Sequence, residues 1–311
     1  MIVALIISSM SFAQTLSKDF EVTNGSPYGV VDGSNKKYVT LGDGMVISVK
    51  QDGELFTVQK NDINTGKEVG RSSYEDFPKY AKPQSLSVAD GKVFYVFEAY
   101  NKKAKTFSVY LREINVTSVK FEAQKELFTT TRPVVIPRNL SITGVGIQMK
   151  MVPKFQVSTS FDESKILIQY RNKPLIKDDS KNYDQIGFYV FDTKFEKIWG
   201  REVKMPHTEK EMNNLAYAVT NSGDVFMLSR LNETQSFEVI TVTESDLKSK
   251  KLDVKEGLLF DKFDLRESAD GNLLAAGYYA NGIEFKMNWT GGTSLSKNIN
   301  GLYTFEFKQD G

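Results

Sequence analysis

Residues 83–130 read PQSLSVADGKVFYVFEAYNKKAKTFSVYLREINVTSVKFEAQKELFTT, a stretch with three or four short strands separated by turns. The run at 93–97, VFYVF, is apolar at every position, which is typical of a strand buried on both faces. The next strand, 107–112 (FSVYLR), alternates, with Phe107, Val109 and Leu111 on one face. This stretch therefore predicts a sheet whose central strand is covered on both sides.

A unit made of a tight turn and a following apolar strand recurs along the chain. The turns are Gly42-Asp43-Gly44, Asp90-Gly91, Asp162-Glu163-Ser164, Ser222-Gly223-Asp224 and Asp270-Gly271-Asn272. The strands that follow them are expected at 45–49, 93–97, 166–170, 225–228 and 273–279. Successive turns are 47, 73, 59 and 48 residues apart. A propeller blade of four strands takes about 40–50 residues, so two spacings fit directly and two require insertions.

Both insertions are visible, at 131–153 and at 172–184. The strand pattern resumes after each of them. Further strands are expected at 186–191, 195–203, 237–242, 252–259, 262–266 and 302–307. Residues 208–215 (TEKEMNNL) favour one or two turns of helix, with Thr208 as the N-cap and Glu211 as its capping-box partner.

The predicted fold follows from burial. A single blade exposes both faces of its sheet, and radial stacking of blades covers those faces. The sequence therefore predicts an all-β protein, a β-propeller with about five visible four-stranded blade units, possibly incomplete. Residues 305–311 form a strand and then a turn, which normally leads into another strand. Either a strand near 20–22 completes the last blade, or blades are missing at the C-terminal end.

Composition excludes several classes of site. The 311 residues are 40% hydrophobic and 25% charged, as in globular proteins. Lys and Arg number 40 against 39 Asp and Glu, so nothing favours nucleic acid or an anionic membrane surface as a partner. Cysteine is absent and His207 is the single histidine, which excludes disulfides, thiolate chemistry and metal sites built from several imidazoles.

The N-terminal residues predict an export signal. Residues 2–7 are apolar (IVALII), and Ser11-Phe12-Ala13 precedes Gln14 in a pattern typical of signal-peptide cleavage. We expect a signal peptide at 1–13, a propeller domain at 14–311 and a secreted protein in the periplasm, on the outer surface or in the medium. The apolar run is shorter than the roughly 20 residues that span a bilayer. The alternative is a buried first strand, and the basic residues that usually open a signal peptide are missing.

Several segments carry a resemblance to known proteins. They are SFAQ at 11–14, IGFYVFD at 186–192 with KIW at 197–199, MPHTE at 205–209 and SADGNL at 268–273. With them the chain resembles secreted Gram-negative bacterial β-propeller proteins of unassigned function. The turn Asp270-Gly271-Asn272 resembles those of TolB-like or NHL-like blades. The resemblance implies an architecture and brings no catalytic residues.

The sequence contains candidate residues for two kinds of catalytic chemistry. A Ser-His-Asp hydrolase would need His207, but the chain contains no Gly-x-Ser-x-Gly elbow, so a surface or loop histidine is expected. A glycosidase needs only two carboxylates at a set separation, and Asp162, Asp264 and Glu267 lie on or beside strands expected to be innermost. The alternative is that Asp162 serves the turn and that the other two face solvent or pair with neighbouring cations.

Two loops are candidate binding sites. Asp178, Asp179 and Asp184 share a loop with Asn182 and could hold Ca²⁺, but lysines interleave them and a solvated loop is expected. The insertion at 131–153 is apolar for a loop. It either covers one mouth of the channel or meets a partner, or else forms an irregular outer strand. Deleting 137–148 is predicted to leave the fold intact and to abolish partner capture.

The sequence predicts a secreted, non-enzymatic propeller that acts as a binding or scaffold module at the cell envelope, with a protein or glycan ligand. The alternative is an extracellular propeller glycoside hydrolase or lyase that uses paired carboxylates. No catalytic residue, cofactor or metal is assigned, and a membrane-spanning protein is not expected.

Overall fold

The computed structural model describes residues 35–135, 138–143, 146–151, 153–176, 178–234, 236–252, 259–280, 283–287, 293–297 and 301–308. Within these ranges every regular element is a β-strand. No helix long and apolar enough to cross a membrane occurs in this part of the chain. The predicted signal peptide at 1–13 and the strand near 20–22 lie outside the described residues.

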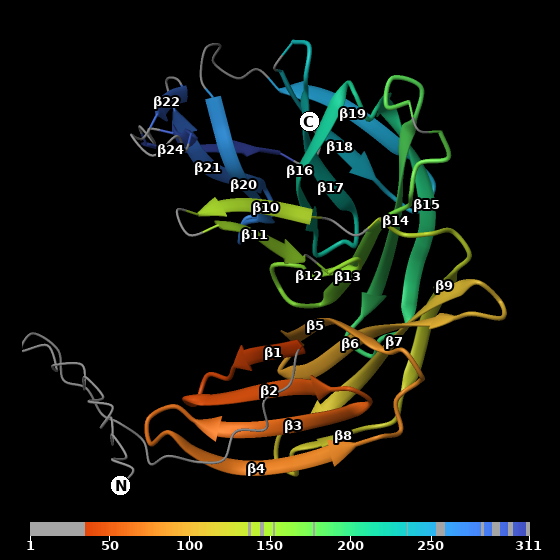
Figure 1. Ribbon diagram of the computed structural model, residues 1–311. Coiled ribbons are helices and arrows are strands. Elements are labelled where there is room, and N and C mark those ends of the chain that lie inside the picture. The colour runs from red at the N-terminus through yellow and green to blue at the C-terminus, as the bar shows by residue number, and fades with distance from the viewer. Residues whose placement is uncertain are drawn as a thin grey trace, which may run out of the picture.

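Five antiparallel sheets follow one another along an arc (Figure 1). Blade one contains β1 (Asn35–Thr40), β2 (Met45–Asp52), β3 (Leu55–Asp62) and β4 (Lys67–Tyr74). Blade two contains β5 (Lys82–Ala89), β6 (Lys92–Asn101) and β7 (Thr106–Asn115), with β8 (Lys120–Phe121) and β9 (Lys125–Thr130) both paired to β7. Blade three contains β12 (Gln156–Thr159), β13 (Lys165–Arg171), β14 (Tyr183–Asp192) and β15 (Lys197–Thr208).

Blade four contains β16 (Met212–Val219), β17 (Val225–Leu231), β18 (Phe237–Val242) and β19 (Leu247–Leu252). Blade five contains β20 (Leu259–Glu267), β21 (Leu273–Ala280) and β24 (Gly301–Phe307). Two hairpins stand apart from the blades: β10 (Arg138–Thr143) with β11 (Gly146–Met151), and β22 (Ile283–Met287) with β23 (Thr293–Lys297). The predicted β-propeller with about five blade units is confirmed.

The first strand of each blade is the innermost one. β5 lies against β1 and β12, and β16 lies against β12 and β20. All five turns predicted from the repeat join a first strand to a second strand. Four of these turns place a glycine at positive φ, and blade three instead places Glu163 there, at 60°. The repeat seen in the sequence therefore marks the same mouth of the propeller in every blade.

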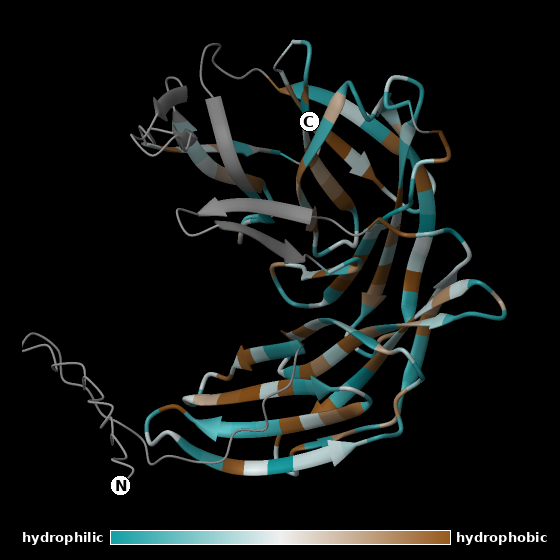
Figure 2. Cartoon of the chain, in the orientation of Figure 1, coloured by the Kyte–Doolittle hydropathy of each residue, from teal (hydrophilic) through white to brown (hydrophobic). Residues whose placement is uncertain are grey.

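Strand β6 is buried on both faces, as predicted, because each face packs against a neighbouring blade. Tyr95 and Phe97 join the cluster that contains Phe56 of blade one. Phe94 and Val96 join the cluster that contains Ile166 of blade three. Figure 2 shows the corresponding pattern, with hydrophobic residues interspersed among hydrophilic ones along the strands. Successive residues of β6 thus point alternately toward blade one and blade three, so one strand contributes to two interfaces between blades.

The polar face of β7 is also buried. Ser108 and Arg112 are both shielded from solvent, although the alternation predicted here is correct. The guanidinium of Arg112 lies 4.9 Å from the centre of the Phe77 ring and donates to Asp76 Oδ1 at 2.8 Å. Because a planar guanidinium can stack on aromatic rings, Arg112 fits an interface that would exclude most charged side chains.

The helix predicted at 208–215 is wrong. Strand β15 ends at Thr208, a tight turn follows, and β16 begins at Met212. Met212 is buried in the cluster between blades three and four, so tertiary packing overrides a weak local helix preference. The predicted contact between Thr208 and Glu211 does form, since the backbone N–H of Thr208 donates to Glu211 Oε2 at 2.9 Å.

Two strand boundaries also differ from prediction. The strand expected at 195–203 begins at Lys197, because Phe195 has φ of 61° and belongs to the preceding turn. The strand expected at 252–259 is replaced by β19, which ends at Leu252, and by β20, which begins at Leu259. Residues 253–258 lie outside the described ranges.

Candidate functional site

A cavity of about 490 Å³ lies against the innermost strands of blades three, four and five, and we name it the axial cavity. Pockets that hold small molecules measure roughly 300–1,000 Å³, so its size suits a ligand. The polar residues that line it include Lys154, Gln156, Gln169, Arg171, Asn214 and Asp264. They come from β12, β13, β16, β20 and the segment before β12.

A pair of glutamines forms one wall of the axial cavity. Gln156 of β12 and Gln169 of β13 are cross-strand partners in the ladder, so their side chains lie together. Gln169 Nε2 donates to Gln156 Oε1 at 2.7 Å. A carboxamide is both a donor and an acceptor, so the pair still offers the amino group of Gln156 and the carbonyl of Gln169 to a ligand.

The guanidinium of Arg171, at the end of β13, is held by two carboxylates. It donates to Asp184 of β14 and to Glu209, which follows β15. Burial disfavours the charge on Arg171, but the two carboxylates outweigh burial and raise its pKa. Burial also disfavours the charge on Glu209, and it raises the pKa of this carboxyl group. Asn214 Nδ2 donates to the same Asp184 at 3.2 Å, which extends this network to blade four.

The ammonium of Lys154 is also paired. It lies 2.5 Å from Glu98 Oε1 of β6 and 4.6 Å from the centre of the Phe107 ring. Glu98 is only 2% exposed, so its carboxylate depends on this cation. Next to Lys154, the backbone N–H of Phe155 donates to Gln84 Oε1 at 3.1 Å. The two cations that line the axial cavity therefore each have a carboxylate partner.

Tyrosine side chains complete the cavity wall. Burial raises the pKa of Tyr217 and of Tyr170, so both phenols stay protonated. The hydroxyl of Tyr170 donates to Glu202 Oε1 at 2.9 Å. The axial cavity thus combines amides, phenols, two cations with internal partners and the exposed carboxylate of Asp264. Such a wall suits a neutral, polar ligand better than an anion.

Of the carboxylates singled out in the sequence, Asp264 alone lines this cavity. Asp264 is exposed, whereas Glu267, three residues later on β20, is buried. Residues separated by an odd number along a strand point to opposite faces, so Asp264 and Glu267 cannot share one site. Glu267 Oε2 instead accepts a hydrogen bond from the backbone N–H of Asn221 at 2.7 Å.

Asp162 serves its turn, as the alternative reading of the sequence expected. Its carboxylate accepts hydrogen bonds from Ser160 Oγ at 2.7 Å and from the backbone N–H of Ser164 at 2.9 Å. Its own backbone N–H donates to Asn221 Oδ1 at 3.0 Å. Asn221 therefore links the turn of blade three to Glu267 of blade five.

His207 bridges two blades and is not part of a catalytic triad. His207 Nε2 lies 2.9 Å from Glu238 Oε2, and Ser249 Oγ donates to the same oxygen at 2.8 Å. Both side chains bond to the carboxylate, whereas a nucleophilic serine must bond to the imidazole. His207 lies on β15 rather than in a loop, and its ring helps to fasten blade three to blade four.

Among the acidic side chains that the sequence suggested for Ca²⁺ binding, Asp178 and Asp184 do not lie together. Asp178 accepts hydrogen bonds from Ser180, while Asp184 lies buried on β14 beside Arg171. Within the described ranges, no group of three or more acidic or histidine side chains could hold a metal ion. The sequence offered no signal for the role of Asp184, because Arg171 belongs to the preceding strand.

The insertion at 131–153 forms the β10–β11 hairpin, which is a two-stranded sheet of its own. This differs from the irregular outer strand that was the alternative reading. At its base, Val134 is buried and forms a bridge with Asn172. Three apolar residues of this insertion, Ile136, Val145 and Val152, lie outside the described residues.

Comparison with known proteins identifies similar folds and no family. No protein-family model and no curated protein sequence matches the chain. An α-L-arabinanase from Penicillium chrysogenum, solved with arabinobiose, is 11% identical with a TM-score of 0.39 over 84% of this chain and 79% of its own. An endo-arabinase from Bacteroides thetaiotaomicron is 11% identical with a TM-score of 0.36 over 76% of this chain and 81% of its own.

An acylaminoacyl peptidase from Pyrococcus horikoshii is similar over part of its length. It is 11% identical with a TM-score of 0.40 over 86% of this chain, but this chain spans only 40% of the peptidase. At such identities and scores, likeness does not carry a site or an activity from one protein to another.

Proposed function

We propose that this protein is a binding module whose axial cavity takes a neutral glycan. The observation that carries the proposal is the Gln156–Gln169 pair, set in a wall where Lys154 and Arg171 are already matched by carboxylates. Sugar hydroxyls are donors and acceptors at once, as the two carboxamides are. An anionic ligand would have to break an internal ion pair to gain a partner here.

The test is isothermal titration calorimetry with neutral oligosaccharides. The set includes arabinobiose, the ligand of the Penicillium structure, together with xylo- and galacto-oligosaccharides. Gln169→Ala and Tyr217→Phe should each weaken binding about tenfold, since each removes one hydrogen-bonding group. Gln124→Ala, an exposed glutamine in the segment between β8 and β9, is the matched control. No binding of any neutral oligosaccharide, or equal affinity of all variants, would reject the proposal.

A second candidate function is glycoside hydrolysis, which the exposed carboxylate of Asp264 in the cavity wall favours. Hydrolysis needs a second carboxylate within about 5–10 Å, and among the described lining residues Asp264 is the single acid. If the protein hydrolyses an oligosaccharide of this set, Asp264→Asn should abolish turnover and keep binding. Absence of turnover in the wild-type protein removes this candidate.

Export and cell-envelope location remain part of the proposal and rest on residues 1–14. The resemblance to secreted Gram-negative propellers, and to TolB-like or NHL-like blades, also remains a proposal. It rests on the segments at 11–14, 186–192, 197–199, 205–209 and 268–273. N-terminal sequencing of the native protein from the medium and the envelope fraction should begin at Gln14. A mature protein that retains residues 1–13 would show that this stretch belongs to the fold.

The β10–β11 hairpin remains a proposed contact for a partner. Its separation from the blade sheets supports deletion of 137–148 without loss of the fold. Retained thermal stability with lost ligand capture is the expected result, and unfolding of the deletion variant would make the hairpin structural.

A further inference from the structure

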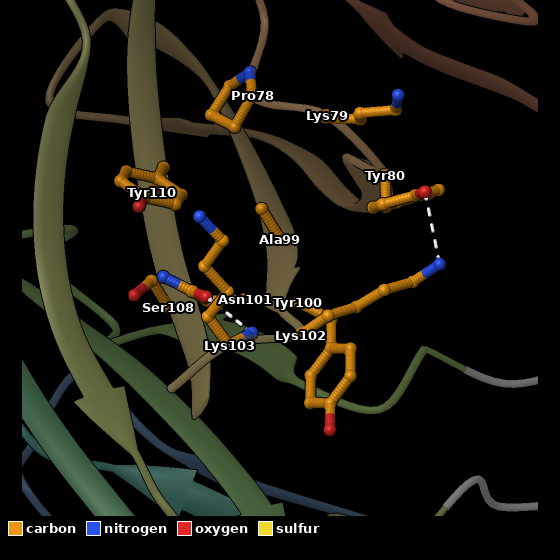
Figure 3. A pocket seen from close by; sticks show the side chains of 10 residues that line it. All are labelled: Pro78, Lys79, Tyr80, Ala99, Tyr100, Asn101, Lys102, Lys103, Ser108 and Tyr110. Carbon is orange, nitrogen blue, oxygen red and sulfur yellow. Dashed lines mark hydrogen bonds between the residues drawn. The ribbon is translucent and has the colours of Figure 1, made fainter. Parts of the chain in front are cut away.

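A second cavity, of about 340 Å³, lies where residues 102–105 join β6 to β7, and we name it the rim pocket (Figure 3). One side is formed by the segment between β4 and β5, which supplies Lys79 and Tyr80. The other side is formed by the β6–β7 hairpin, which supplies Lys102, Lys103 and Tyr110. Aromatic and cationic side chains therefore meet in one cavity, away from the residues that line the axial cavity.

The three lysines of the rim pocket have no carboxylate partner among the described residues. Lys79, Lys102 and Lys103 take part in none of the ion pairs there. Lys102 instead contacts a phenol: its ammonium donates a hydrogen bond to the hydroxyl of Tyr80 at 3.0 Å. Three cations around one cavity attract an anion, and none of them has to give up an ion pair to bind it.

Tyr80 occupies a backbone position that tyrosine rarely adopts. The backbone N–H of Ala81 donates to the carbonyl of Pro78 at 3.0 Å, which closes a turn with Tyr80 in its third position. Tyr80 has φ of 65°, and turns with positive φ at this position usually carry glycine or asparagine. A bulky residue held there despite strain points to a role for its side chain.

The ring of Tyr80 is positioned to receive a ligand. The ammonium of Lys102 lies 4.2 Å from the ring centre and that of Lys79 lies 5.6 Å from it. The hydrogen bond from Lys102 lowers the pKa of Tyr80, and the carboxylate of Glu54 opposes this only weakly. Tyr80 is 46% exposed, so part of its ring is accessible to a ligand. Tyr80 also lines a smaller neighbouring cavity of about 140 Å³.

We propose that the rim pocket is a binding site for an acidic oligosaccharide. Figure 3 shows the side chains of Lys102 and Lys103 extending to opposite sides of the pocket, toward Tyr80 and Tyr110. Separate carboxylate or sulfate groups of the oligosaccharide would therefore bind the two ammonium groups through charge-assisted hydrogen bonds. The apolar face of the sugar ring would pack against the exposed part of the Tyr80 ring. A neutral glycan would leave the lysines unused, and a free inorganic anion would leave Tyr80 unused.

The proposal is tested by titration calorimetry of the full chain with tetragalacturonate, a sulfated heparin tetrasaccharide, inorganic sulfate and maltotetraose. At least one of the two acidic tetrasaccharides should bind at least tenfold more tightly than both sulfate and maltotetraose. The acidic tetrasaccharide with the higher affinity then identifies the anionic group, carboxylate or sulfate, that the pocket prefers. Lys102→Gln/Lys103→Gln should lower that affinity at least tenfold. Lys194→Gln, an exposed lysine in the β14–β15 turn, should leave it unchanged.

Tyr80→Asn separates a binding role from a structural one. Asparagine tolerates positive φ, so this variant should keep or raise the melting temperature while its affinity for the acidic tetrasaccharide falls at least tenfold. Tyr80→Phe keeps the ring and should retain most of the affinity. Equal binding of sulfate and the tetrasaccharides, no binding of either tetrasaccharide, or full affinity in Tyr80→Asn would each overturn the proposal.

The inference is independent of the proposed function of the axial cavity. Gln169→Ala should leave binding of the acidic tetrasaccharide unchanged, because its residues line the other cavity. Lys102→Gln/Lys103→Gln should leave binding of neutral oligosaccharides unchanged. Loss of both activities in either variant would show that the two cavities do not act separately.

Discussion

Lys154 and Arg171 at the axial cavity each have a carboxylate partner, whereas Lys79, Lys102 and Lys103 at the rim pocket have none among the described residues. The difference follows from burial. Glu98 is almost fully buried beside Lys154, and a buried charge without a partner is strongly unfavourable. The rim lysines reach solvent, which tolerates unpaired charge. The paired cations of the axial cavity therefore contribute to the stability of the fold, whereas the unpaired lysines of the rim pocket are available to bind an anionic ligand.

The largest expected effect concerns the apolar packing that surrounds the buried pair. Phe94 lies on the same face of β6 as Glu98 and is fully buried between blades two and three. Phe94→Ala should lower the free energy of unfolding by about 3–5 kcal/mol, as large-to-small core changes do. Val225→Ala tests the second strand of blade four, where Val225 is also fully buried but faces the preceding blade. Chemical denaturation measures both, and a loss below about 0.5 kcal/mol would mean that the residue is not core.

Glu98→Gln should be the most damaging change to a charge. It leaves the ammonium of Lys154 without a counter-charge and should cost about 3 kcal/mol. The double variant Glu98→Gln/Lys154→Met should be more stable than Glu98→Gln, since no unpaired charge remains. A double variant as unstable as the sum of the two single variants would show that the pair does not interact.

Asp184→Asn should have a smaller effect of about 1.5–3 kcal/mol, the usual range for a hydrogen bond to a charged group. Arg171 keeps Glu209 as a second partner, and asparagine can still accept from Asn214. Thermal unfolding should show this loss. Asp178→Asn, in the exposed loop before β14, serves as the control and should change stability little. Equal losses in both variants would contradict the special role of Asp184.

The smallest stability effect is expected at the rim pocket. Lys102→Gln/Lys103→Gln should change the free energy of unfolding by less than about 0.5 kcal/mol, as exposed substitutions usually do. Its effect should be on binding instead. A stability loss comparable to that of Glu98→Gln would remove the contrast between the two cavities, since it would make the rim lysines structural.

The five turns and the strands after them were predictable, because a tight turn requires residues of special backbone freedom and a buried strand requires an apolar run. The helix at 208–215 was mispredicted, since Met212 contributes to a core formed by distant strands. Asp264 and Glu267, two of the three carboxylates considered for a glycosidase, cannot act together for a reason that the sequence contained, since residues three apart on a strand face opposite ways. The Asp184–Arg171 pair carried no local signal.

The sequence by itself determined the architecture. Its period specifies the blades, and the parity of β6 places Glu98 on the same buried face as Phe94 and Val96. Only the tertiary structure decided which charges are paired and which are free. Lys154 and Glu98 lie 56 residues apart and meet because blades two and three stack. Strand patterns act within a few residues, whereas charge pairing depends on distances between blades that no local pattern encodes.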